Sequence, residues 1–131
     1  MTLLEMPDGP WWEWEILSLN RGRLILAGSF DLSYYHQIEI AFTDVAYLSC
    51  AAAFCDPAFR EPTEAELHHA THQNGMDVPP VVVAFDHDFG RPVSCVIAAG
   101  SVEITTGMVH RVPPQRLEPG DRLAPWLEQP P

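Results

Sequence analysis

The fold class is decided by the stretch Tyr34-Tyr35-His36-Gln37-Ile38-Glu39-Ile40-Ala41-Phe42. Its even-numbered positions are mainly apolar, and its odd-numbered positions are mainly polar or small. Side chains of a β-strand alternate between the two faces of a sheet, so this two-residue period predicts a half-buried strand. The even-numbered side chains, His36 among them, are expected to face inward.

Further strands are predicted on both sides of this stretch. Trp12, Trp14 and Ile16 alternate with glutamates, and a turn ending at Gly22 leads into the returning strand of a hairpin. Two later runs are almost continuously apolar, which is typical of strands that are buried on both faces. Gly107 predicts a bulge in the last strand. The predicted strands cover residues 12–16, 23–27, 34–42, 45–50, 81–85, 93–98, 101–105 and 109–112.

One helix is predicted between the two groups of strands. Thr63 and Glu66 have the spacing of a capping box, in which each side chain bonds the backbone amide of the other residue. We therefore expect a short α-helix at about 64–73. The pattern as a whole predicts a mainly β fold: an antiparallel β-sandwich or small open barrel of about seven to eight strands with this one helix inserted.

The length of 131 residues predicts a single mostly-β domain over residues 1–131, with an irregular Pro-rich segment from about 113. No apolar run approaches the ~20 residues of a membrane span, and the first residues lack the basic start of a secretory signal. Three cysteines, at positions 50, 55 and 95, suit reduced structural thiols. We expect a cytoplasmic protein.

The formal net charge is −11, from 18 acidic residues against seven arginines and no lysine. A chain this acidic is repelled by phosphate backbones and anionic lipids, so nucleic acid and membranes are poor partners. A basic protein partner and a homo-oligomer built through a sheet edge are both compatible with it. The charge, the size and the lack of a phosphate loop or nucleophile elbow favour a non-enzymatic protein-interaction module, of the accessory or immunity type.

The alternative is a small metal- or ligand-binding β domain, hydrolytic in one version. Its basis is that Glu64, His68 and His72 recur every four residues along the predicted helix and would share one face. A carboxylate and two imidazoles so placed could bind a divalent cation. A solvated polar face explains the same pattern.

Two further groups of residues are candidates. Tyr34, His36, His87 and His110 are the side chains that we expect at the mouth of a pocket, if the barrel or sandwich has one. His87 also belongs to Asp86-His87-Asp88, which we expect at the tip of a hairpin. Trp11, Trp12 and Trp14 either anchor one sheet face in the core or form an interface, where tryptophan is enriched.

Overall fold

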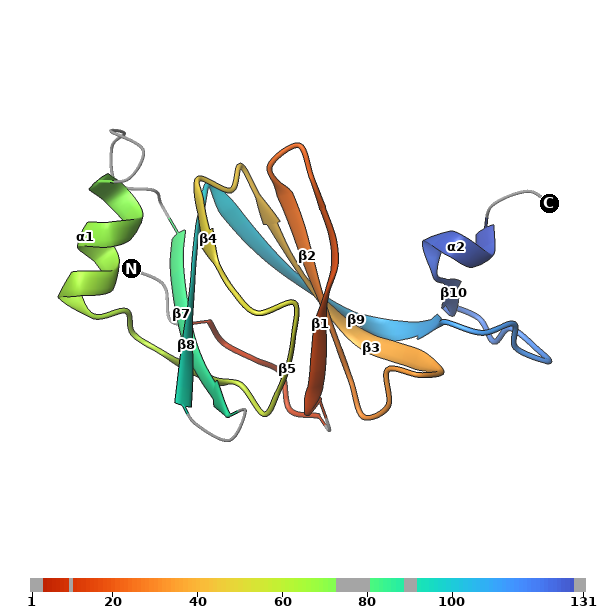
Figure 1. Ribbon diagram of the computed structural model, residues 1–131. Coiled ribbons are helices and arrows are strands. Elements are labelled where there is room, and N and C mark those ends of the chain that lie inside the picture. Colours follow the sequence, from red (N-terminus) through yellow and green to blue (C-terminus); the bar gives the residue numbers. More distant parts are fainter. Residues whose placement is uncertain (1–3, 10, 73–80, 89–91, 129–131) are drawn as a thin grey trace.

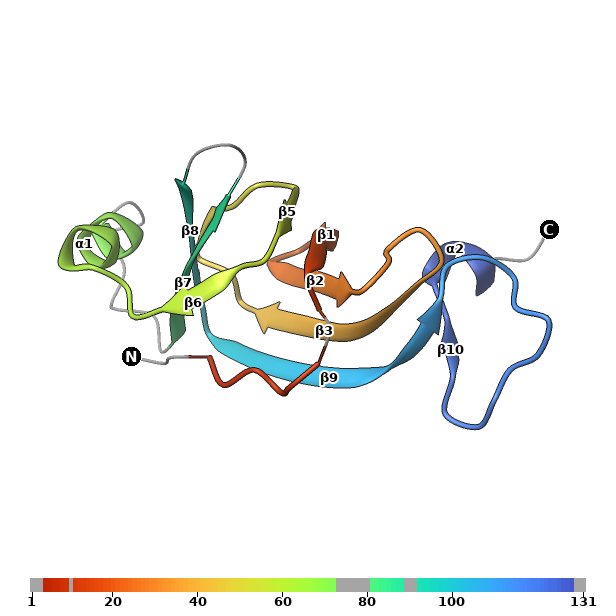
Figure 2. The same cartoon turned by 90° about the horizontal axis from the view of Figure 1, so that it is seen from below.

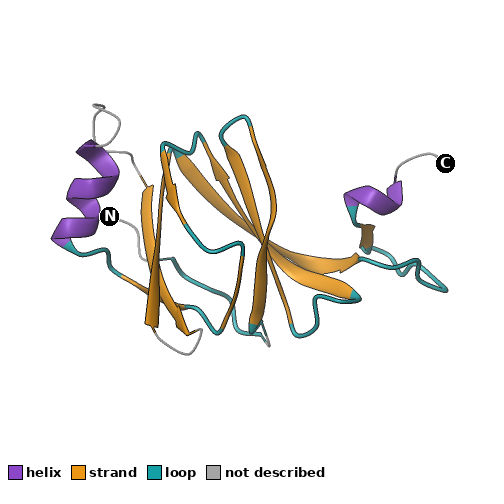
Figure 3. Ribbon diagram, viewed as in Figure 1, coloured by secondary structure: helices purple, strands orange, loops and turns teal. Residues whose placement is uncertain are grey.

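The computed structural model describes residues 4–9, 11–72, 81–88 and 92–128. They form two β-sheets packed face to face, a short helix on the outer face of one sheet, and a C-terminal helical turn (Figures 1 and 3). The predicted mainly β, antiparallel sandwich is confirmed, and the sheets do not close into a barrel.

The larger sheet has six strands in the order β10-β9-β3-β2-β1-β5. All neighbours are antiparallel except β10 and β9, which are parallel. In Figure 2 the long strands β3 and β9 curve together along this sheet. Its strands are β1 (Glu13–Asn20), β2 (Arg23–Ser29), β3 (Tyr35–Thr43), β5 (Ala53–Cys55), β9 (Ser101–His110) and β10 (Arg122–Leu123).

The smaller sheet has four antiparallel strands in the order β4-β8-β7-β6. The chain passes from this sheet to the larger one at Gly100, between β8 and β9. The elements of this half are β4 (Tyr47–Ser49), β6 (Ala58–Arg60), α1 (Glu64–His72), β7 (Val81–Asp88) and β8 (Pro92–Ala99), and α2 (Pro125–Glu128) follows β10 at the other end of the molecule.

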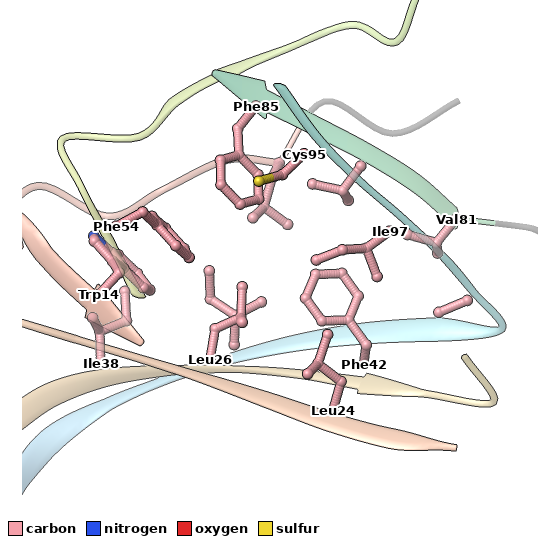
Figure 4. Close-up of a cluster of buried hydrophobic side chains, with 14 residues drawn as sticks. Trp14, Leu24, Leu26, Ile38, Phe42, Phe54, Val81, Phe85, Cys95 and Ile97 are labelled. Carbon is pink, nitrogen blue, oxygen red and sulfur yellow. The ribbon is translucent and has the colours of Figure 1, made fainter. Parts of the chain in front are cut away.

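The main core lies between the two sheets, as Figure 4 shows. Trp14 stacks parallel to Phe54 at a ring-centroid distance of 6.3 Å, and Phe54 contacts Phe85 of the smaller sheet at 4.8 Å. Gly28 is required beneath Trp14, because a Cβ atom there would lie 2.7 Å from the indole ring. The buried members of this cluster are Leu4, Trp14, Leu24, Leu26, Ile38, Ile40, Phe42, Phe54, Val81, Val83, Phe85, Cys95, Ile97 and Ala99.

A second, smaller core joins α1 to the outer face of the four-stranded sheet. Ala70 of the helix packs on Val82, Ala84, Val96 and Ala98, which is why β7 and β8 are apolar on both faces. The capping box is present: Glu66 N–H donates to Thr63 Oγ1 at 3.1 Å and Thr63 N–H donates to Glu66 Oε1 at 2.9 Å. The helix thus lies across the outer face of the four-stranded sheet.

The hairpin between β1 and β2 turns as predicted, through Arg21 and Gly22 at φ values of 53° and 75°. The prediction that Asp86 and His87 lie at a hairpin tip is wrong, since both lie inside β7 and pair with Ser94 and Val93. Residues 89–91, which follow β7, and residue 73, the last of the predicted helix, lie outside the described residues. The Pro-rich C-terminal segment is irregular until Asp121 and then forms β10 and α2.

Candidate functional site

One end of the six-stranded sheet collects most of the exposed apolar side chains. Antiparallel pairing brings together the start of β1, the end of β2, the start of β3 and the end of β9. Among the described residues, seven large apolar side chains are exposed, and five lie at this end, with 41 to 58% of their surface accessible. We call these five the apolar rim: Trp12, Phe30, Tyr34, Val112 and Trp126.

Backbone bonds hold the rim segments next to one another. Trp12 N–H donates to the carbonyl of Ser29, the residue before Phe30, at 3.2 Å. Arg111 N–H donates to the carbonyl of Tyr34 at 2.8 Å, which places Val112 beside it. The loop between β2 and β3 lies on the same side of the molecule as α2 in Figure 2. The strand order therefore brings the rim residues together from separate segments of the chain.

Arg111 is buried behind the rim and connects it to the sheet. Its Nη1 group donates to Glu15 Oε1 and, at 3.3 Å, to the carbonyl of Leu32. Its guanidinium carbon lies 5.6 Å from the ring centre of Trp126, whose Nε1–H donates to the Arg111 carbonyl at 3.0 Å. The arginine thereby fixes α2, the loop between β2 and β3, and β1 against each other.

His36 is fully buried next to Arg111. Arg111 Nε–H can only donate, so His36 Nδ1 accepts this bond at 3.0 Å. His36 Nε2 therefore donates to Glu39 Oε2, at 2.7 Å. Glu39 and Arg111, the partners of His36, lie on the face of the larger sheet opposite the inter-sheet core. The alternation of the sequence had instead predicted that His36 faces inward. A register shift between His36 and Ile38 interrupts the alternation there, opposite the predicted irregularity at Gly107, whose φ is 147°.

The Glu39 carboxylate is held by two donors. The hydrogen bond from His36, together with the nearby Arg122 guanidinium at 3.5 Å, keeps the pKa of Glu39 below its usual range in spite of its burial. At the end of β9, His110 Nε2 lies 2.9 Å from Asp121 Oδ2, and this hydrogen bond lowers the pKa of the Asp121 carboxyl. The polar groups behind the rim thus bind chiefly to one another.

A groove of about 510 Å³ runs between the outer face of the sheet and the C-terminal segment. Trp126 belongs to both the groove and the rim, so the two features are continuous. The walls of the groove are mainly apolar, with charged groups from three strands. The lining residues are Leu17, Ser18, Arg23, Ile25, Glu39, Val109, Arg122, Leu123, Pro125 and Trp126.

The four residues predicted at a pocket mouth separate into two places. Tyr34, His36 and His110 come to the same end of the larger sheet, where Tyr35 pairs with His110. None of these three side chains lines the groove. His87 lies instead in the smaller sheet and is buried, with its ring centre 5.4 Å from that of Phe54.

The three tryptophans separate as well. Trp14 is buried in the main core, as the core interpretation predicted, and its Nε1–H donates to the Trp11 carbonyl at 3.0 Å. Trp11 is half-buried and packs against that core. Trp12 is exposed and belongs to the rim.

On α1, Glu64 and His68 are exposed, and His72 ends the helix, but its side chain lies outside the described part of the structure. Among the described side chains, no group of three or more His, Cys, Asp or Glu is placed to hold a metal ion. Metal binding by Glu64, His68 and His72 stays a prediction.

The sequence pattern did not single out Arg111, Glu15 or Glu39 as a group, nor Phe30, Val112 and Trp126. The available signal was the position of large apolar residues at or beyond the ends of predicted strands. These residues can be assigned to one surface only when the strand order is known.

No family model, curated protein or solved structure matches the chain in comparisons with each of these three. Of the helices in the described residues, none is long and apolar enough to cross a membrane.

Proposed function

We propose that this chain is a non-enzymatic protein-interaction module that docks the apolar rim on a basic surface of a partner protein. The observation that carries the proposal is the gathering of five exposed large apolar side chains at one end of a strongly acidic domain. Scattered exposed apolar residues are ordinary, whereas a contiguous group with charged surroundings is typical of an interface.

The charges around the rim favour a basic partner. Glu13 and Asp31 lie in or beside the loop that carries Phe30, where Glu13 Oε2 accepts from Leu32 N–H at 2.8 Å. Asp56 N–H donates to the Trp12 carbonyl at 2.8 Å, which places a third carboxylate at the rim. Arg111, the cation behind the rim, is buried and paired with Glu15. Carboxylates at the edge of an apolar patch would steer a cationic surface toward it.

The polar groups behind the rim support binding rather than catalysis. His36, Arg111, Glu39 and Glu15 are bonded to each other, so they are committed to holding the rim segments in place. We also place the protein in the reducing cytoplasm, a proposal that its three free cysteines support.

The test is selection of peptides from a randomised display library on the immobilised wild-type chain. We expect selected peptides to be rich in arginine or lysine with apolar neighbours. The variant Trp12→Ala/Phe30→Ala/Tyr34→Ala should bind them at least about tenfold more weakly, because truncated aromatic anchors each cost on the order of 1–2 kcal/mol. Raising the salt concentration from about 0.05 to about 0.5 M should also weaken binding, since it screens the carboxylates.

The matched control is Leu19→Ala, which removes an equally exposed apolar side chain at the opposite end of β1. It should bind the selected peptides like the wild type. Failure to enrich any peptide, enrichment of acidic peptides, or equal binding by the rim variant and the control would each contradict the proposal.

A second candidate function, the binding of a small amphipathic carboxylate, is favoured by the groove. Its walls include Ile25, Val109 and Leu123, and two guanidinium groups, of Arg23 and Arg122, stand against the single carboxylate of Glu39. Titration of the protein with decanoate, followed by calorimetry, tests this. Saturable binding that Arg122→Gln weakens supports it, and absence of heat at millimolar decanoate contradicts it.

Self-association through a sheet edge remains a proposal with a structural difficulty. Each of the four edge strands, β4, β5, β6 and β10, has only two or three residues. Short edge strands offer few unpaired backbone groups to another chain. Light scattering that shows a monomer at micromolar concentration would exclude it.

A further inference from the structure

A second cluster of reactive side chains lies away from the rim, at the junction of β4 and β8. Ser49, the last residue of β4, pairs with Val96 of β8 in an antiparallel register. Continuing this register by one residue brings Cys50, the residue after β4, opposite Cys95 of β8. Both side chains pack in the main core, and the Cys50 S–H donates to the Ala51 carbonyl oxygen at 3.3 Å.

The Cys95 sulfur lies near the Cys50 thiol, the backbone N–H of Ala51 and the ring of His87. These neighbours, Cys50 first, lower the pKa of the Cys95 thiol against the opposing effect of burial. The neighbouring Cys95 sulfur and burial raise the pKa of the Cys50 thiol. Such an arrangement stabilises a thiolate on one sulfur beside a thiol on the other.

The third cysteine, Cys55, differs from Cys95 in its location and in the direction of its pKa shift. Cys55 lies in β5 of the other sheet and pairs across to Glu13. Burial and the negative charges of Glu13 and Asp56 raise the pKa of its thiol. It is therefore a weak nucleophile near neutral pH and a natural internal control for the pair.

We propose that Cys50 and Cys95 are a peroxide-sensitive dithiol that closes reversibly to a cross-strand disulfide between β4 and β8. Residues directly opposite in an antiparallel pair have Cα atoms about 4.5–5.5 Å apart, within the range of about 4.4–6.8 Å that disulfides require. Cys95 is buried, but its partner Cys50 is only half-buried, so a water-sized oxidant such as hydrogen peroxide approaches along the Cys50 side.

The reaction has two steps. The Cys95 thiolate attacks one oxygen of hydrogen peroxide, the O–O bond breaks, and the departing hydroxide takes a proton from solvent to form water. The Cys50 sulfur then attacks the resulting sulfenic acid of Cys95. The S–S bond forms, the S–O bond breaks, and the second hydroxide leaves as water with the Cys50 proton. Two thiols are oxidised and one peroxide is reduced, and a small dithiol reductant reverses the change.

The experiment exposes the full-length chain to hydrogen peroxide at pH 7 and follows it by intact-mass spectrometry and peptide mapping. We expect loss of two hydrogen atoms, a link that maps to Cys50 and Cys95, and an unmodified Cys55. The variant Cys55→Ser should behave identically, and Cys50→Ser should leave Cys95 to accumulate oxygen adducts instead of a link.

His87→Gln provides a test that does not remove either sulfur. Losing the imidazole beside Cys95 should slow disulfide formation about tenfold at pH 7, and the difference should shrink as the pH rises and Cys95 ionises unaided. Circular dichroism confirms that each variant is folded before it is compared. The proposal is overturned if folded wild-type chain oxidises first at Cys55, if the linked pair involves Cys55, or if peroxide leaves Cys50 and Cys95 as thiols.

Discussion

Arg111 is the residue whose removal should perturb the candidate site most. The variant Arg111→Ala leaves Nδ1 of the fully buried His36 without its donor and removes the partner of Glu15. An unsatisfied buried acceptor costs about 1–3 kcal/mol. Losing the contact with the Trp126 ring adds about 1 kcal/mol, so we expect a loss of about 2–4 kcal/mol in the free energy of unfolding.

The measurement is urea unfolding at pH 7 combined with thermal unfolding. With an unfolding entropy of about 2.1 cal/mol/K per residue, this loss corresponds to a fall in Tm of roughly 7–15 °C for a chain of this size. The summed tryptophan fluorescence of the folded variant should also shift to longer wavelength, because the Trp126 indole packs on Arg111. That second readout separates loss of the rim's support from a general loss of stability.

The matched control is Arg116→Ala. Arg116 is 83% exposed and pairs with the exposed Glu118 at 3.5 Å, so its removal should change stability by less than about 0.5 kcal/mol. If the two arginine variants unfold at the same urea concentration, the buried network behind the rim does not stabilise the fold and the reasoning is refuted.

Two further perturbations test the core and the attachment of α1. Gly28→Ala places a methyl group 2.7 Å from the Trp14 ring, so we expect destabilisation by about 1–3 kcal/mol in urea unfolding; an unchanged midpoint would contradict the packing described here. Arg60 bonds Glu66 of the helix and Asp86 of β7 and lowers the pKa of both carboxyls below their ordinary values of 4.5 and 3.8. Wild type should therefore exceed Arg60→Met by about 1 kcal/mol at pH 7, and this advantage should fade as pH falls below about 4.5; an advantage that persists at pH 2 would contradict it.

Much of the sandwich could be predicted because its long strands carry their own signal. The alternation through Ile38, Ile40 and Phe42 and the apolar runs of β7 and β8 gave the elements of both sheets. The capping box placed the start of α1 at the observed residue. These features are local, so one segment is sufficient to recognise each of them.

What could not be predicted depends on contacts between distant segments. Strands β5, β6 and β10 have two or three residues, too few to show a period, and exist because a longer strand pairs with them. The register shift at His36 moves its ring to the outer face, which alternation alone would not indicate. Arg111 meets Glu15 across 96 positions of the chain, and the rim exists only once the strand order is known.

The central claim is that the rim is the docking surface. The most direct test is hydrogen–deuterium exchange of the wild-type chain, measured with and without the basic peptide that binds it most tightly. Residues 11–13, 29–34, 111–113 and 125–127 should exchange more slowly in the complex, while residues 19–22 and α1 should be unchanged. Protection confined to α1 or to the four-stranded sheet, with the rim segments unaffected, would contradict the claim.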